Sequence, residues 1–237
     1  MQKKTKRFLT ALLVLAASSV GLGSWFYGTG GAAGGGGDVA IDTTAIASQA
    51  TPAASTLDLN ITVASNSNRV LYVFTHSADD NRAVTSVVSD LDGAFDGSAA
   101  ISSSDNSDYI RTECWVLTAP STGAQVITVT WGENQDDLGV TGYSLYNVDQ
   151  TTPNGTPQPD NTTNPTASVT VPSGGWAIAG VTSDDNTVVE DVGTDEKQVA
   201  TVGDMGIAIG DRSTTGSLGW ATGEGGGFIA LPINKAP

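Results

Sequence analysis

Three aspartates in one short loop are the residues best suited to hold a metal ion. Asp90, Asp92 and Asp96 lie within the sequence Asp-Leu-Asp-Gly-Ala-Phe-Asp-Gly. Calcium prefers several oxygen ligands, and closely spaced carboxylates supply them. The spacing differs from an EF-hand because no glutamate closes the loop. Since Asp-Gly pairs also form ordinary turns, two interpretations stay open: a calcium site and a plain turn. No other cofactor is expected.

A single histidine and a single cysteine limit the nucleophilic and zinc chemistry open to the chain. Any Ser-His-Asp site would have to use His76, but the chain has no Gly-x-Ser-x-Gly elbow. We predict that His76 lies on the surface at the end of a strand. Because Cys114 is the only cysteine, the chain can form neither an intrachain disulfide nor a multi-cysteine zinc site. Its apolar, strand-like surroundings predict a buried and unreactive thiol.

Glutamates and tryptophans raise the question of sugar chemistry. A glycosidase needs two carboxylates about 5–10 Å apart, and no strand carries its glutamates in such a pattern. The five glutamates are Glu113, Glu133, Glu190, Glu196 and Glu224. Trp131 and Trp176 lie in apolar runs and are expected in the core. Trp220 lies in a glycine-containing segment, and we expect it to be exposed, where its ring could stack on a sugar.

Charge excludes one class of partner. The chain has 10 Lys and Arg against 25 Asp and Glu, a net charge of −15. Four of the bases precede residue 8 and no acid precedes Asp38, so six bases face all 25 acids from residue 38 onward, a charge of −19. A body of this charge repels phosphate backbones and anionic membrane surfaces, which argues against nucleic-acid binding.

The N-terminus predicts export. Residues 1–7 are basic and residues 8–23 are apolar or small, as in a signal peptide. Alternatively, residues 8–27 remain as a membrane-spanning helix, with Trp25, Phe26 and Tyr27 at the outer interface. Residues 28–37 contain seven glycines and predict a flexible tether. Either interpretation places the body outside the cytoplasm or at the cell surface, with residues 8–27 as the only contact with a membrane.

The rest of the chain predicts strands separated by Gly, Asn, Asp, Ser and Pro clusters. No stretch keeps a helical period, so the sheets are expected to be antiparallel. We predict an all-β, two-sheet sandwich, jelly-roll-like, in a single domain over residues 38–237, with a barrel as the less favoured alternative. Residues 149–165, with four prolines, are expected to form a surface loop rather than a domain linker. The predicted strands are 56–63, 70–75, 84–89, 109–117, 125–131, 139–148, 167–171, 176–182, 187–192, 205–210, 217–221 and 227–233.

Four segments are similar to a sandwich module of bacterial secreted and surface proteins and of phage structural proteins. They are residues 68–73 (NRVLYV), 115–123 (WVLTAPSTG), 142–156 (GYSLYNVDQTTPNGT) and 228–233 (FIALPI). The third segment is the most specific, and within it Asp149 is expected to cap a turn. The resemblance covers roughly residues 40–237. It implies a jelly-roll-like sandwich and an extracellular or virion-surface setting, and it brings no catalytic residues.

These features together favour a structural or adhesive module without catalysis. Its partners would be surface glycans or other copies of itself. A carbohydrate-binding module is the alternative, and a glycan-cleaving enzyme is a weaker one. The two main hypotheses differ in one respect: a sugar binder should expose aromatic side chains on a concave face, and a structural module need not.

Overall fold

The structure is a computed structural model that describes residues 37–49, 53–78, 82–95, 97–103, 110–183, 190–191, 195–222 and 226–237. The expected signal or anchor segment (residues 1–27) and nearly all of the glycine tether lie outside these residues. Gly35–Pro237 form one compact unit, which is described below by itself. Within the described ranges no helix is long and apolar enough to cross a bilayer.

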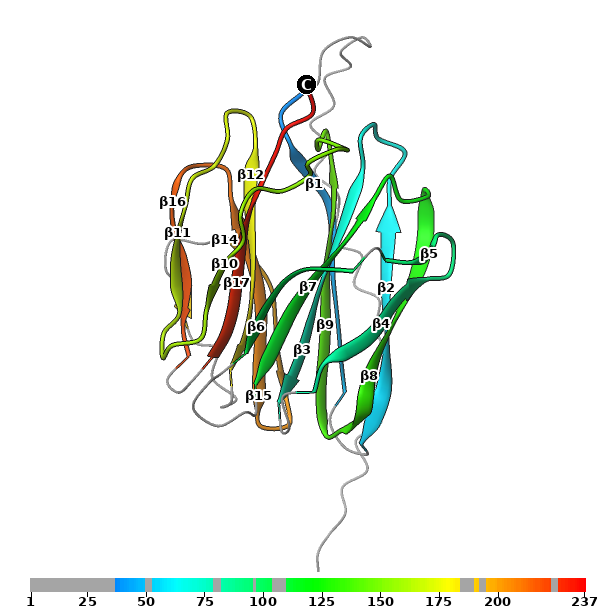
Figure 1. Cartoon of the computed structure of the whole chain (residues 1–237), viewed down its shortest axis with the longest axis vertical. Coiled ribbons are helices and arrows are strands. Elements are labelled where there is room, and N and C mark those ends of the chain that lie inside the picture. Colours follow the sequence, from blue (N-terminus) through cyan, green and yellow to red (C-terminus); the bar gives the residue numbers. More distant parts are fainter. Residues whose placement is uncertain are drawn as a thin grey trace, which may run out of the picture. The chain divides into compact units, whose positions relative to one another are not determined.

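The described residues form antiparallel sheets, as predicted (Figure 1). The first sheet contains, in order across it, β2 (Ala54–Val63), β8 (Gly123–Gln135), β4 (Val84–Ser89) and β5 (Gly93–Ala94). The second contains β1 (Ala40–Gln49), β9 (Asp137–Tyr146), β3 (Val70–Ala78), β7 (Arg111–Thr118) and β6 (Ser98–Ser103). The third contains β10 (Gln158–Asp160), β17 (Gly226–Ile233), β12 (Trp176–Ser183), β15 (Met205–Arg212) and β14 (Asp195–Val202). The fourth contains β11 (Thr166–Val169), β16 (Gly216–Ala221) and β13 (Glu190–Asp191).

The prediction of only two sheets is wrong, because the four sheets stack as layers. Figure 1 shows them from the first sheet on the right to the fourth on the left. The physical reason lies in the inner strands, whose two faces are both apolar. In β3, Leu71 belongs to the core shared with the first sheet, whereas Phe74 belongs to the core shared with the third. In β12, Ile178 faces the second sheet's core and Val181 belongs to the core shared with the fourth.

The layers divide the chain into two consecutive halves. Residues 38–148 build the first and second sheets, and residues 154–237 build the third and fourth. The segment 149–165 therefore carries the chain from one pair of sheets to the other and contributes β10, rather than being a plain surface loop of one sandwich. Its first turn is capped as predicted: Asp149 Oδ1 accepts hydrogen bonds from the backbone of Thr151 (2.8 Å) and Thr152 (3.0 Å).

Alternating burial follows the predicted pattern in the first sheet. In β8 every second residue from Gln125 to Trp131 is buried, and the residues between them are partly exposed. In β2 the residues Leu59, Ile61 and Val63 are buried while their neighbours face solvent. This is the one-sided burial expected of an outer layer.

The two ends of the compact unit lie side by side. Asp38 Oδ1 lies 3.2 Å from Lys235 Nζ, and the backbone of Val39 donates to the carbonyl of Gly174 (2.8 Å). Lys235 also bridges to Val148, at the end of the first half. The start of β1 and the C-terminus accordingly meet at one pole, which Figure 1 shows at the top. This arrangement fixes the two halves to each other where the chain enters and leaves.

Candidate functional site

Trp220 does not lie on the surface, which corrects the expectation of a sugar-stacking ring. It is fully buried between the third and fourth sheets, and its ring lies 5.9 Å from that of Phe228, at a tilt of 60°. The glycine that precedes it serves close packing: a Cβ on Gly219 would lie 2.6 Å from the carbonyl oxygen of Pro165. The Trp220 ring is enclosed in the same core cluster as Leu218 and Phe228, so it cannot meet a ligand.

Asp90 and Asp92 are used within the fold of their own loop. Asp90 Oδ1 accepts a hydrogen bond from the backbone of Val126 (2.9 Å). Both carboxylate oxygens of Asp92 lie within 3.1 Å of the backbone nitrogen of Ser121. These bonds join the β4–β5 turn to the start of β8. Asp96 lies outside the described residues, and within the described part of the chain no three His, Cys, Asp or Glu side chains are grouped to hold a metal. Calcium at this loop stays a prediction.

His76 is not a surface residue either, and the reason is that β3 runs on to Ala78 instead of ending at Thr75. The imidazole is fully buried between the second and third sheets. Its Nδ1 lies 2.8 Å from Thr182 Oγ1 and its Nε2 lies 3.0 Å from Thr141 Oγ1. Burial lowers the pKa of His76 to about 3, so the ring is neutral at physiological pH.

The burial predicted for Cys114 is confirmed. The thiol lies in the core between the second and third sheets, and burial raises the pKa of Cys114 far above its ordinary value. A protonated thiol in an apolar core is a poor nucleophile and a poor metal ligand. Trp131 is buried in the core between the first and second sheets, as expected, and Trp176 is partly buried against the next core.

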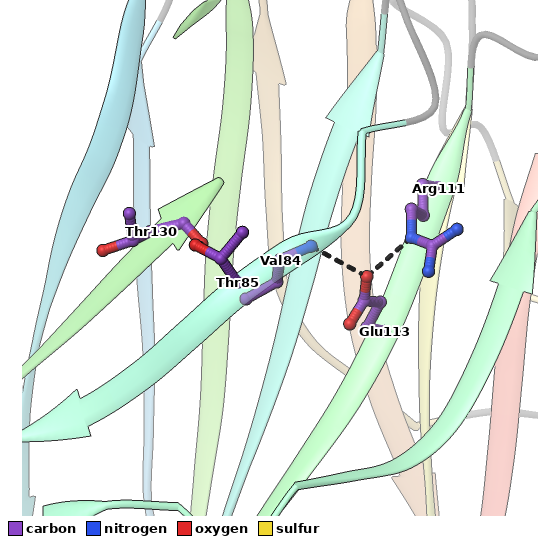
Figure 2. Close-up of polar contacts among 5 residues, drawn as sticks. All are labelled: Val84, Thr85, Arg111, Glu113 and Thr130. Carbon is purple, nitrogen blue, oxygen red and sulfur yellow. Dashed lines mark hydrogen bonds and ion pairs between the residues drawn. The ribbon is translucent and has the colours of Figure 1, made fainter. Parts of the chain in front are cut away.

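A largely buried ion pair on β7, whose residues were not predicted to pair, also links the first two sheets through its carboxylate (Figure 2). Glu113 on β7 is buried, and its Oε1 lies 2.6 Å from Arg111 Nε. The same oxygen accepts a hydrogen bond from the backbone of Val84 (3.0 Å), where β4 begins. Nearby, Thr85 Oγ1 donates a hydrogen bond to the carbonyl oxygen of Thr130 (3.1 Å), and both residues are labelled in Figure 2. The carboxylate therefore fixes the entry of β4 onto the second sheet.

Glu133 and Asp137 also contact other groups of the protein. Glu133 pairs with Arg82 on the surface at 3.1 Å. Asp137 is 8% exposed, and its carboxylate accepts a hydrogen bond from the backbone of Asp204 (3.2 Å). Desolvation raises the pKa of Asp137, and the charges of Asp204 and Asp136 raise it further. The side chains of the other three glutamates lie outside the described part. Glu133 thus acts as a pair partner and Asp137 as a backbone acceptor.

Comparisons of the chain with protein-family models, with curated proteins and with solved structures found no match.

Proposed function

We propose that this chain is an exported structural or adhesive module, whose β body is held outside the cytoplasm by its N-terminal segment. The observation that carries the proposal is the order of parts along the chain. A basic start, an apolar stretch and a run of glycines precede a body whose two ends meet at one pole. A tether joined to that pole leaves the rest of the body available to partners.

The use of polar side chains supports this role. Asp90, Asp92 and Asp149 hold turns, and Glu113 holds a strand. Carboxylates that accept hydrogen bonds from the backbone fix the shape of the molecule, which is what a structural or adhesive module needs. The outer layers support the same role. The first sheet exposes Thr, Asn and Asp side chains from β2, and the fourth exposes Thr166, Ser168 and Ser217. We expect other copies of the chain or surface glycans as partners.

Two finer elements belong to the same proposal. The connectivity is jelly-roll-like, in keeping with the resemblance to secreted, surface and virion modules. Residues 8–27 form a hydrophobic helix that either acts as a cleaved signal or stays in the membrane as an anchor. Sugar stacking on Trp220 and glycan cleavage are not proposed, because Trp220 is buried and the most central glutamate, Glu113, is paired with Arg111.

A reporter that is active only outside the cytoplasm tests the proposal. We expect the reporter to be active when it is fused after residue 40 of this chain. Leu13→Arg is the matched control, since a charge in the apolar segment blocks insertion and should abolish the signal. A wild-type fusion no more active than the Leu13→Arg fusion would contradict export.

A further inference from the structure

Four buried hydrogen bonds form one continuous chain across the boundary between the two halves. His76 on β3, Thr141 on β9 and Thr112 on β7 belong to the first half, whereas Thr182 on β12 and Gly227 on β17 belong to the second. The three threonine side chains and the imidazole are all at most 1% exposed. Three of the four bonds cross between the second and third sheets: His76 to Thr182 (2.8 Å), Thr112 to Thr182 (2.6 Å) and Thr112 to Gly227 (2.9 Å).

The direction of all four hydrogen bonds follows from the carbonyl of Gly227, at the end of the series. The carbonyl of Gly227 can only accept, so the Thr112 hydroxyl donates its one proton there. Thr112 Oγ1 must then accept from the Thr182 hydroxyl, and Thr182 Oγ1 must accept from Nδ1–H of His76. In a neutral imidazole the other nitrogen is an acceptor, so Nε2 accepts from the Thr141 hydroxyl. Of the two neutral tautomers, only the one that carries its proton on Nδ1 satisfies all four bonds.

No charged group described on the strands around His76 compensates a protonated ring. On β7, Arg111 and Glu113 pair with each other on the opposite face of the sheet. On β15, Asp211 lies four residues beyond Ile207 and accepts from Trp176 Nε1 (3.0 Å).

On β9, Gly139 lies next to His76, because a Cβ added to Gly139 would lie 3.3 Å from His76 Cβ. The closest carboxylate along this strand is that of Asp137, two residues before Gly139. That carboxylate is engaged with the backbone of Asp204. β12 and β17 bring no charged side chain to this face within their described ranges. Among the described residues, a proton on Nε2 would therefore add a buried charge without a counter-ion and leave the Thr141 hydroxyl without its acceptor.

We propose that this chain of hydrogen bonds is an acid-sensitive latch, which holds the second and third sheets together at neutral pH and releases them when His76 gains a proton. Each half keeps its own outer interface when the latch opens, because the first and second sheets share a core separate from that between the third and fourth. An exported protein meets changes of pH that a cytoplasmic one does not, so such a device has a setting in which to act.

The chain contains its own probes for this proposal, since it has one histidine and one cysteine. Cys114 lies two residues from Thr112 on the same face of β7, within the core between the second and third sheets. Opening of this interface exposes the thiol, so the rate at which a disulfide reagent active in acid modifies Cys114 measures the opening equilibrium.

The expected effect follows from proton linkage. The ordinary histidine pKa of about 6.5 applies to the opened form, and the closed form stays neutral well below it. Opening should therefore be about 25-fold more favourable at pH 5 than at pH 7. The labelling rate, divided by that of a free thiol at the same pH, should rise by this factor in the wild type. It should stay nearly constant in His76→Asn, which has no titrating ring.

Two further readouts make the result decisive. In the wild type, ¹⁵N-histidine NMR should show the Nδ1–H tautomer and no titration of the folded protein between pH 8 and pH 5. The labelling rate should depend on urea less steeply than global unfolding does, since only one interface opens. An ordinary titration near pH 6.5, a rate without pH dependence, an equal rise in His76→Asn, or a urea dependence equal to that of global unfolding would each overturn the latch.

Discussion

The ion pair between Arg111 and Glu113 gives the sharpest prediction about stability. The side chains are 17% and 3% exposed, and Glu113 Oε1 serves both Arg111 Nε (2.6 Å) and the backbone of Val84 (3.0 Å). Glu113→Ala removes this acceptor from a desolvated guanidinium and a desolvated backbone N–H. Breaking a buried pair in this way costs about 3–5 kcal/mol of unfolding free energy. For a domain of this size, that corresponds to a fall in Tm of about 6–20 °C.

The chain offers a matched control in the pair of Arg82 with Glu133. Their distance is 3.1 Å, but the side chains are 40% and 63% exposed. Water and salt screen such a pair, so Glu133→Ala should cost about 0–1 kcal/mol. Glu113→Gln should lie between the two, because an amide oxygen still accepts from Val84 but carries no charge.

Urea unfolding at pH 7, followed by tryptophan fluorescence, measures all three variants on one scale. The midpoint should fall most for Glu113→Ala, less for Glu113→Gln and least for Glu133→Ala. If Glu113→Ala and Glu133→Ala have the same midpoint, the carboxylate does not hold β4 onto the second sheet, and our interpretation of Figure 2 is wrong.

Three further outcomes are expected. Gly180→Ala should lower the free energy of unfolding in urea by about 1–3 kcal/mol, because the added Cβ would lie 2.5 Å from Phe74 Cδ1. Gly132→Ala is the control, since its Cβ meets its nearest atom at 3.7 Å and should change stability little. Equal losses in the two variants would contradict close packing between the halves. Trp220→Ala should lower the free energy of unfolding by about 3–5 kcal/mol, because the ring is buried. If the wild type binds to a glycan array and Trp220→Phe does not, the buried position of the ring is contradicted. If the loop with Asp92 binds calcium, millimolar calcium should raise the Tm by several degrees more than sodium does at equal ionic strength. Asp92→Asn should remove this difference. Equal Tm shifts in the two salts would show that the loop is a plain turn.

Local pattern was enough to predict the strands whose burial is set by their own sequence. The predicted strand 84–89 coincides with β4, and the alternation in β8 matches its observed burial. The strands that were not predicted, β1, β5, β6, β10 and β14, lack such a pattern. Five of the six residues of β6 are Ser or Ala, and β14 begins with Asp195, Glu196 and Lys197, types that are depleted in strands.

Positions that depend on distant partners could not be predicted in the same way. Whether His76 and Trp220 are buried depends on which sheets cover β3 and β16, and those sheets come from residues about 100 and about 50 positions away. The two-sheet prediction failed for the same reason, since a strand with two apolar faces can be recognised only as buried, not as a layer between two others. Glu113 had a detectable signal: Arg111 and Glu113 stand two residues apart, hence on one face of an otherwise apolar strand.

External protease on intact cells that produce the full-length chain tests the central claim, that the body is displayed outside the cytoplasm. The compact unit should resist digestion, whereas residues 28–37, which their glycine-rich sequence predicts to be a flexible tether, should be cut. We predict that a resistant fragment of about residues 38–237 is already in the medium if the N-terminal segment is cleaved, or is released by the protease if that segment is retained. A full-length chain that stays intact and cell-associated until the cells are lysed would contradict the account.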